Sequence, residues 1–139
     1  MLKKLVLFLL FFGVGLVFYY SWLPDHNMES ETYLPKWLLN WSNKHYNLRT
    51  AIPFIFFGFL LEEYSYRRTS NKIEINKNLI FIQNLVMAAV VVSIAECGQF
   101  LIKNRSPDLM DIYFGIIGSL IGGLVHILFD KVIKLRNAK

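Results

Sequence analysis

Apolar residues gather in four long blocks that are separated by short polar segments. The blocks cover residues 5–23, 48–61, 79–102 and 112–133. A helix needs roughly 20 mainly apolar residues to cross about 30 Å of hydrocarbon, and the first, third and fourth blocks reach that length. The pattern predicts an all-α membrane protein built as a bundle of four transmembrane helices. We expect these helices at about residues 4–23, 48–66, 79–102 and 109–133.

The second block is the short one, because charged residues bound it at Arg49 and Glu62. A helix that crosses the membrane here must direct the Arg49 side chain outward to the polar surface. At its other end the helix must continue through Glu62 and Glu63 toward Arg67. We therefore predict a second transmembrane helix that is longer than its apolar core.

The polar segment at residues 24–47 contains one further helical pattern. Its apolar residues recur at the spacing i, i+3, i+4, i+7 and are Leu34, Trp37, Leu38 and Trp41. Pro35 suits the first turn of a helix. Amphipathic helices rich in aromatic residues are typical of the membrane–water interface. We expect a short interfacial helix in this first outward loop, as part of an aromatic belt or as a ligand surface.

Composition agrees with a membrane protein of one domain. Hydrophobic residues make up 55% of the 139 residues, and only 18% are charged, which is little for a water-soluble domain. The chain shows no repeat and no second domain, so residues 1–139 are predicted to form a single transmembrane domain. Lys3 and Lys4 precede an apolar run longer than that of a typical signal peptide, which favours an uncleaved first helix.

The basic residues indicate orientation and not nucleic-acid binding, although the net charge is +5. Ten of the fifteen fall on one predicted side and are Lys3, Lys4, Arg67, Arg68, Lys72, Lys77, Lys131, Lys134, Arg136 and Lys139. The other side has Lys36, Lys44, Arg49, Lys103 and Arg105. By the positive-inside rule, both termini of this multi-pass protein are cytoplasmic. The cell (cytoplasmic) membrane is the predicted location, and the lipid bilayer, with its anionic lipids, the predicted partner.

A polar stretch lies where the third and fourth blocks meet. Ionisable side chains at membrane depth are costly, so by default they mark a site. Glu96 and Gln99 share a helical face, and Asp111 opens the last helix. Arg105 lies in the hairpin between them, where Asp108 is placed to cap the next helix. We expect a ligand-binding polar corner near the outer leaflet, formed by Glu96, Gln99, Arg105, Asp108 and Asp111.

Two interpretations of this corner remain open. In one, Arg105 neutralises Glu96 or Asp111, and the charges only satisfy each other. In the other, the corner binds a phosphate, sugar or peptide carboxylate attached to a lipid, because one arginine leaves three carboxylates partly uncompensated. No metal or cofactor is predicted, since His126 lies toward the opposite end of its helix, four residues before Asp130.

The last helix carries small residues along one face. Asp111, Gly115, Gly118, Gly122 and Val125 alternate in spacing between four and three residues. Small residues let the backbones of membrane helices approach closely. We therefore expect Gly115, Gly118 and Gly122 to pack against another helix, within the chain or in a homo-oligomer.

These polar and small residues together resemble the VanZ-like family of small bacterial membrane proteins. The family has a helix ending in Glu-x-x-Gln, a loop arginine, and an aspartate followed by Asn and spaced glycines. The matching residues here are Glu96 and Gln99, then Arg105, then Asp111, then Gly118 and Gly122. Gly115 stands where the family commonly has Asn, which removes one amide from the polar corner.

The resemblance implies a function in antibiotic resistance at the bacterial cell envelope. The family is named for a protein linked to resistance to teicoplanin, a glycopeptide with a lipid tail. The implied activity is lower teicoplanin susceptibility, through action on a lipoglycopeptide or a lipid-linked cell-wall precursor at the outer membrane face. Two alternatives remain: an enzyme that uses Glu96 and Asp111 as an acid/base pair on a lipid-linked substrate, and a structural bundle or complex subunit.

Overall fold

The computed structural model describes the chain except for residues 26, 29–30, 70–75, 104 and 138–139. Within the described residues every regular element is helical, which confirms the all-α prediction. The elements are α1 (Leu2–Ser21), α2 (Lys36–Lys44), α3 (Tyr46–Thr69), α4 (Lys77–Gly98), the 3₁₀ turn η1 (Gln99–Leu101) and α5 (Leu109–Asn137).

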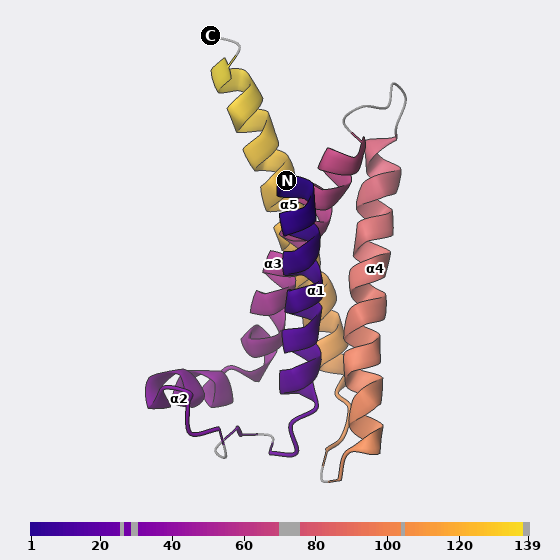
Figure 1. Cartoon of the computed structure of the whole chain (residues 1–139). Coiled ribbons are helices and arrows are strands. Elements are labelled where there is room, and N and C mark those ends of the chain that lie inside the picture. The colour runs from indigo at the N-terminus through magenta and orange to yellow at the C-terminus, as the bar shows by residue number, and fades with distance from the viewer. Residues whose placement is uncertain (26, 29–30, 70–75, 104, 138–139) are drawn as a thin grey trace.

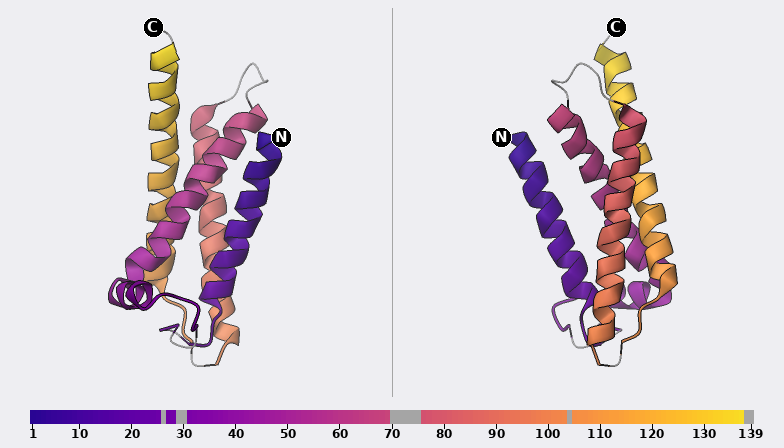
Figure 2. Two further views of the ribbon diagram at one scale, coloured as in Figure 1. Left: turned by 60° about the vertical axis from the view of Figure 1, so that its left-hand side comes forward. Right: turned by 90° about the vertical axis from the view of Figure 1, so that its right-hand side faces the viewer.

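The four long helices lie side by side and alternate in direction (Figures 1 and 2). Both termini lie at one end of this bundle, together with the last turns of α3 and the first turns of α4. The short helix α2 and the connection from α4 to α5 lie at the other end. The arrangement therefore gathers the predicted polar corner at the end opposite the termini.

Three of these helices, α1, α4 and α5, are long and apolar enough to cross a membrane. Their outer faces carry large apolar side chains, among them Phe8 and Phe11 on α1, Val90 on α4 and Leu128 on α5. A soluble monomer rarely exposes so much continuous apolar surface, so these faces suit a lipid environment. Helix α3 is of similar length but carries more polar residues along its course.

The apolar core lies along α3, between α1 and α4. Its best-buried large side chains are Phe54 on α3 and Val92 on α4, which are 2% and 1% exposed. Phe57 packs edge-to-face against Phe54, and Val6 and Leu10 of α1 join the same cluster. Helix α1 thus contributes little buried surface, and α3 is the central element of the bundle.

Helices α3 and α5 approach each other closely at glycine positions. A Cβ atom added at Gly118 would stand 2.3 Å from the Ala51 carbonyl oxygen, and one at Gly122 would stand 1.9 Å from that of Ile55. A Cβ added at Gly115 would instead meet Val92 of α4, at 2.8 Å. The small-residue face of α5 therefore packs against α3 and α4 of the same chain at these three glycines.

The helix bounds differ from the predicted ranges by a few residues: α4 ends at Gly98 and continues as η1 to Leu101, and α5 runs to Asn137, beyond the predicted residue 133. Helix α3 ends at Thr69, beyond the predicted residue 66, and its polar last turns contact α4 and α5. Helix α2 begins at Lys36, directly after Pro35, and runs to Lys44, slightly later than the predicted stripe. In Figure 1 it lies to one side of the lower end of the bundle, with its axis turned away from the direction of the long helices.

Candidate functional site

Glu96 is the centre of the polar corner, near the end of α4. Its side chain is 4% exposed, and both of its carboxylate oxygens accept hydrogen bonds from neutral donors. The Gln99 amide donates to Oε1 at 2.9 Å, and the backbone N–H of Asp108 donates to Oε2 at 3.1 Å. The Glu-x-x-Gln spacing therefore brings two polar groups together on one face, and the hairpin closes over them.

Asp108 and Asp111 have different roles at the start of α5. The Asp108 carboxylate accepts from the backbone N–H of Met110 at 2.8 Å, which ties down the turn before the helix. Asp111 points instead to α3, where the Thr50 hydroxyl donates to its Oδ1 at 2.8 Å. The predicted corner residues are thus brought together, but Thr50 was missed because it lies in a different apolar block.

The end of α1 completes the corner. Gln99 donates a second hydrogen bond to the Ser21 hydroxyl at 3.0 Å, and the Trp22 indole N–H donates to the Ala95 carbonyl of α4 at 3.0 Å. A Cβ at residue 98 would stand 2.3 Å from the Trp22 indole nitrogen, so Gly98 is needed for this approach. The end of α1 is therefore hydrogen-bonded to α4 and to Gln99 at the polar corner.

Arg105 also contacts the end of α1. Its Nη2 donates to the Ser21 carbonyl oxygen at 2.8 Å, a contact that the sequence pattern did not predict. Arg49 lies near enough to act on it electrostatically: burial, and then the positive charge of Arg49, lower the pKa of Arg105. A guanidinium keeps its charge under such shifts, so two cations lie at this corner.

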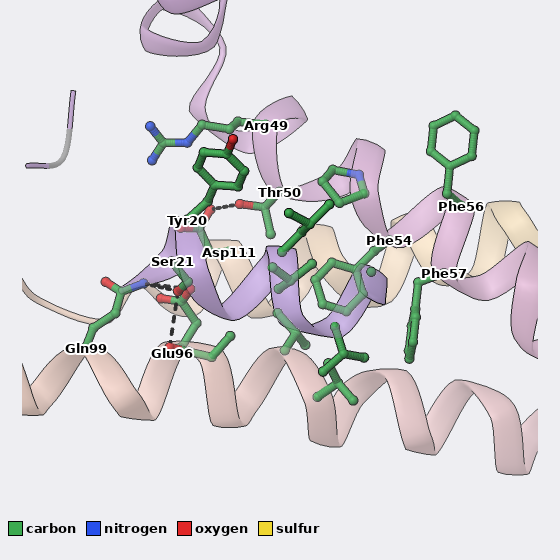
Figure 3. A pocket seen from close by; sticks show the side chains of 18 of the residues that line it. Tyr20, Ser21, Arg49, Thr50, Phe54, Phe56, Phe57, Glu96, Gln99 and Asp111 are labelled. Carbon is green, nitrogen blue, oxygen red and sulfur yellow. Dashed lines mark hydrogen bonds between the residues drawn. The ribbon is translucent and has the colours of Figure 1, made fainter. Parts of the chain in front are cut away.

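A cavity of about 350 Å³ continues from the corner into the apolar part of the bundle. Its polar end is lined by Glu96, Gln99, Arg105, Asp111, Arg49 and Thr50. Its body is lined by apolar side chains of α1, α3 and α4, including Val14, Val17, Phe54 and Phe57. Figure 3 shows the polar groups gathered at one end and the phenylalanines at the other. The cavity is therefore amphipathic along its length.

Arg49 is a lining residue that the sequence pattern assigned only to the membrane surface. It lies in the first turns of α3, and its guanidinium is 5.4 Å from the centre of the Tyr46 ring. In Figure 3 its charged group lies at the polar end of the cavity. A basic residue one turn before the helix-interior Pro53 was the available signal, but no local pattern ties it to α4.

A second polar cluster lies between α3, α4 and α5, toward the end that holds the termini. His126 of α5 is within 2.8 Å of a Glu63 carboxylate oxygen, and Glu63 also pairs with Arg67. The predicted neighbour of His126, Asp130, pairs instead with Lys134 at 2.5 Å. His126 thus connects α5 with α3 and does not pair with Asp130 of its own helix.

The same cluster includes a buried carboxylate on α3. Asn84 of α4 donates to Glu62 Oε1 at 2.8 Å, and the Ser65 hydroxyl donates to Asn84 Oδ1 at 3.0 Å. Glu62 and Asn84 are 8% and 9% exposed. These polar residues join three helices, and their positions inside apolar helices were the only sequence signal for them.

Neither a metal-binding group nor a similar known protein indicates a function for either cluster. The described part of the chain contains no group of three or more His, Cys, Asp or Glu side chains placed to hold a metal ion. Comparison with protein-family models, with curated proteins and with solved structures finds no match. The polar corner and its cavity are therefore the features of the structure that bear on function.

Proposed function

We propose that this protein binds an amphiphile at the outer face of the bacterial cytoplasmic membrane and thereby lowers susceptibility to a lipid-tailed glycopeptide such as teicoplanin. The observation that carries the proposal is the amphipathic cavity. Its polar end presents Glu96, Gln99, Arg105 and Asp111, while its body offers apolar walls. A molecule with a polar head and an apolar tail is complementary to a cavity with a polar end and apolar walls.

Orientation is part of the proposal, with α3 as a fourth transmembrane helix and α2 at the interface. The end of the bundle that holds the termini carries Lys3, Lys4, Arg67, Arg68, Lys77, Lys131, Lys134 and Arg136. An excess of basic residues favours the cytoplasmic side. The polar corner then faces outward, where a lipoglycopeptide or a lipid-linked cell-wall precursor is found.

Support for the VanZ-like assignment comes from the corner residues that carry the resemblance. Glu96 and Gln99 contact each other directly, and Asp111 and Arg105 line the same cavity. Position 115, where the family commonly has Asn, packs against Val92 and lies away from these contacts. The substitution of Gly at this position therefore leaves the described contacts of the corner intact.

The test fills the cavity and measures antibiotic susceptibility. Gly13 lines the cavity, and a Cβ atom added there would have nothing within 4 Å, whereas Gly15 has the same open surroundings but does not line it. In a teicoplanin-susceptible host, expression of the wild-type chain should raise the inhibitory concentration of teicoplanin and not that of a glycopeptide without a lipid tail. Gly13→Leu should abolish the protection, and Gly15→Leu should keep it.

Two further variants test the carboxylates. Glu96→Gln and Asp111→Asn should reduce protection while the protein still inserts at wild-type level, as measured by immunoblotting of membranes. If these variants and Gly13→Leu insert normally and protect fully, the proposed function is wrong.

A further inference from the structure

The cavity opens on one side of the bundle, between α1 and α3. Among the described residues that line it, the exposed ones come from these two helices and are Leu9, Leu16, Pro53 and Phe56. The wall that α4 contributes is covered, with Val92 and Ala95 each 1% exposed. In both views of Figure 2, α1 lies at the edge of the bundle. In Figure 3 the ring of Phe56 points away from those of Phe54 and Phe57. The opening therefore faces sideways, along the length of the helices.

Helix α1 contacts the bundle near its two ends and leaves space between them. Near its C-terminal end, the Trp22 indole N–H donates to the Ala95 carbonyl at 3.0 Å. Nearer the N-terminus, Val6 and Leu10 are 5% and 7% exposed and belong to the apolar core. Gly13 lies between these contacts, and a Cβ atom added there would have nothing within 4 Å. The middle of α1 therefore forms an open wall of the cavity.

The opening lies at the depth where a spanning helix meets hydrocarbon. Leu9 and Leu16 flank the middle of α1, a helix long and apolar enough to cross a membrane. Acyl chains surround the middle of such a helix. At the end of the bundle that holds α2, the cavity is lined by the loop residue Met28, which is 9% exposed, and the Asp108 backbone closes over Glu96. Acyl chains therefore have the more direct access to the cavity.

The size and the walls of the cavity select one chain. A volume of about 350 Å³ is near the lower end of the range for small-molecule sites, about 300–1,000 Å³, and is too small for both chains of a phospholipid. Apolar cavities exclude water, whereas a hydrocarbon chain packed beside Val14, Val17 and Phe57 makes dispersion contacts with them. A segment of a single acyl chain is therefore complementary to this part of the cavity.

We propose that one acyl chain of a bilayer lipid enters the cavity sideways, through the opening between α1 and α3, and packs along its apolar walls. This inference rests on the proposed amphiphile binding. It names the part of the amphiphile that the cavity holds and the route that this part takes. The tail arrives from within the bilayer and not from water, so a lipid-tailed glycopeptide must displace the resident chain in order to place its own tail there.

The test uses the purified full chain in phosphatidylcholine vesicles that include a phosphatidylcholine with a diazirine in the middle of one acyl chain. Illumination attaches this chain to adjacent side chains, and tandem mass spectrometry locates the adducts. A two-chain phospholipid stays in the bilayer, so an adduct within the cavity reports entry from the side. Adducts are expected at Phe57, which is 7% exposed and lines the cavity, and at Phe8, which is 63% exposed. Leu61, one turn further along α3, is 4% exposed in the apolar core and should carry none.

A pair of glycine variants tests the site itself. Gly13→Leu fills the cavity and should remove the Phe57 adducts while the Phe8 adducts remain. Gly15→Leu has the same open surroundings but does not line the cavity, and it should keep both. In the wild-type chain, which needs no variant to fold, labelling of Phe8 without Phe57 would overturn the inference. Equal labelling of Phe57 and Leu61 would also overturn it, because lipid would then penetrate the whole bundle.

The two proposals fail in different ways. If Phe57 carries no adduct while Gly13→Leu still abolishes teicoplanin protection, the sideways entry of a lipid chain is wrong and the proposed function stands. If Phe57 is labelled but the wild-type chain gives no protection, the proposed function is wrong and the acyl-chain site stands.

Discussion

Replacing Gly122 by alanine should destabilise the bundle at the closest approach of two helices. The added Cβ would stand 1.9 Å from the Ile55 carbonyl oxygen and 2.9 Å from the Phe59 nitrogen, whereas ordinary contact begins at 3.4 Å. Both neighbours are backbone atoms and cannot turn aside as a side chain would. Helices α3 and α5 must therefore separate locally by about 1.5 Å, and overpacking of this kind costs about 1–3 kcal/mol.

The control is the same substitution where space is available. Gly15→Ala on α1 meets nothing within 4 Å and gains up to about 1 kcal/mol of helix propensity. Because both variants make the same Gly-to-Ala change, the propensity gain cancels between them. The free energy of unfolding should therefore be about 1–3 kcal/mol lower for Gly122→Ala than for Gly15→Ala.

The assay is reversible unfolding in mixed micelles with increasing sodium dodecyl sulfate, followed by far-ultraviolet circular dichroism. Light scattering on the same samples reports the oligomeric state. Equal midpoints for the Gly122→Ala and Gly15→Ala variants would refute the close α3–α5 contact. A change in oligomeric state with unchanged unfolding of the monomer would also refute it, and would assign the glycine face to an interface between copies.

Two further predictions concern the second polar cluster and the orientation. Asn84→Leu leaves the buried Glu62 without its described donor and should lower the free energy of unfolding by about 1–3 kcal/mol. The control Gln83→Leu, on the exposed side of the same helix, should not lower it. Equal effects of the two substitutions would contradict the role of the cluster. Orientation is tested with cysteine variants made after Cys97 is replaced by serine. A membrane-impermeant maleimide added to intact cells should label Lys103→Cys and leave Lys134→Cys unlabelled. Labelling of Lys134→Cys but not of Lys103→Cys would invert the proposed orientation.

The apolar pattern was sufficient to predict the helices, because hydrophobic length is a local property of sequence. The three helices that are long and apolar enough to cross a membrane begin within two residues of their predicted starts, and the helix ends differ by up to four residues. The polar last turns of α3 were hard to interpret, since Glu62 and Glu63 resemble residues that leave the membrane. Their partners Asn84 and His126 come from other helices, and no spacing within one helix reveals such pairs.

The polar corner was predictable only where its contacts are local. The pair Glu96 and Gln99 follows from helical periodicity, and the structure shows it as a hydrogen bond. The contacts of Ser21 and Thr50 with the corner join residues that are distant along the chain. The hydrogen bond from Arg105 to the end of α1 could not be predicted either, because the position of α1 is a property of the whole bundle.

The close contact of α3 with α5 has a consequence for biogenesis. Ribosomes deliver the chain from its N-terminus, so α1, α2, α3 and α4 are all made before the helix that carries Gly118 and Gly122. Until α5 arrives, the face of α3 around Ala51 and Ile55 lacks its counterpart. The first four helices must therefore wait in a loosely packed state, during which a chaperone or a membrane protease has its best opportunity to act.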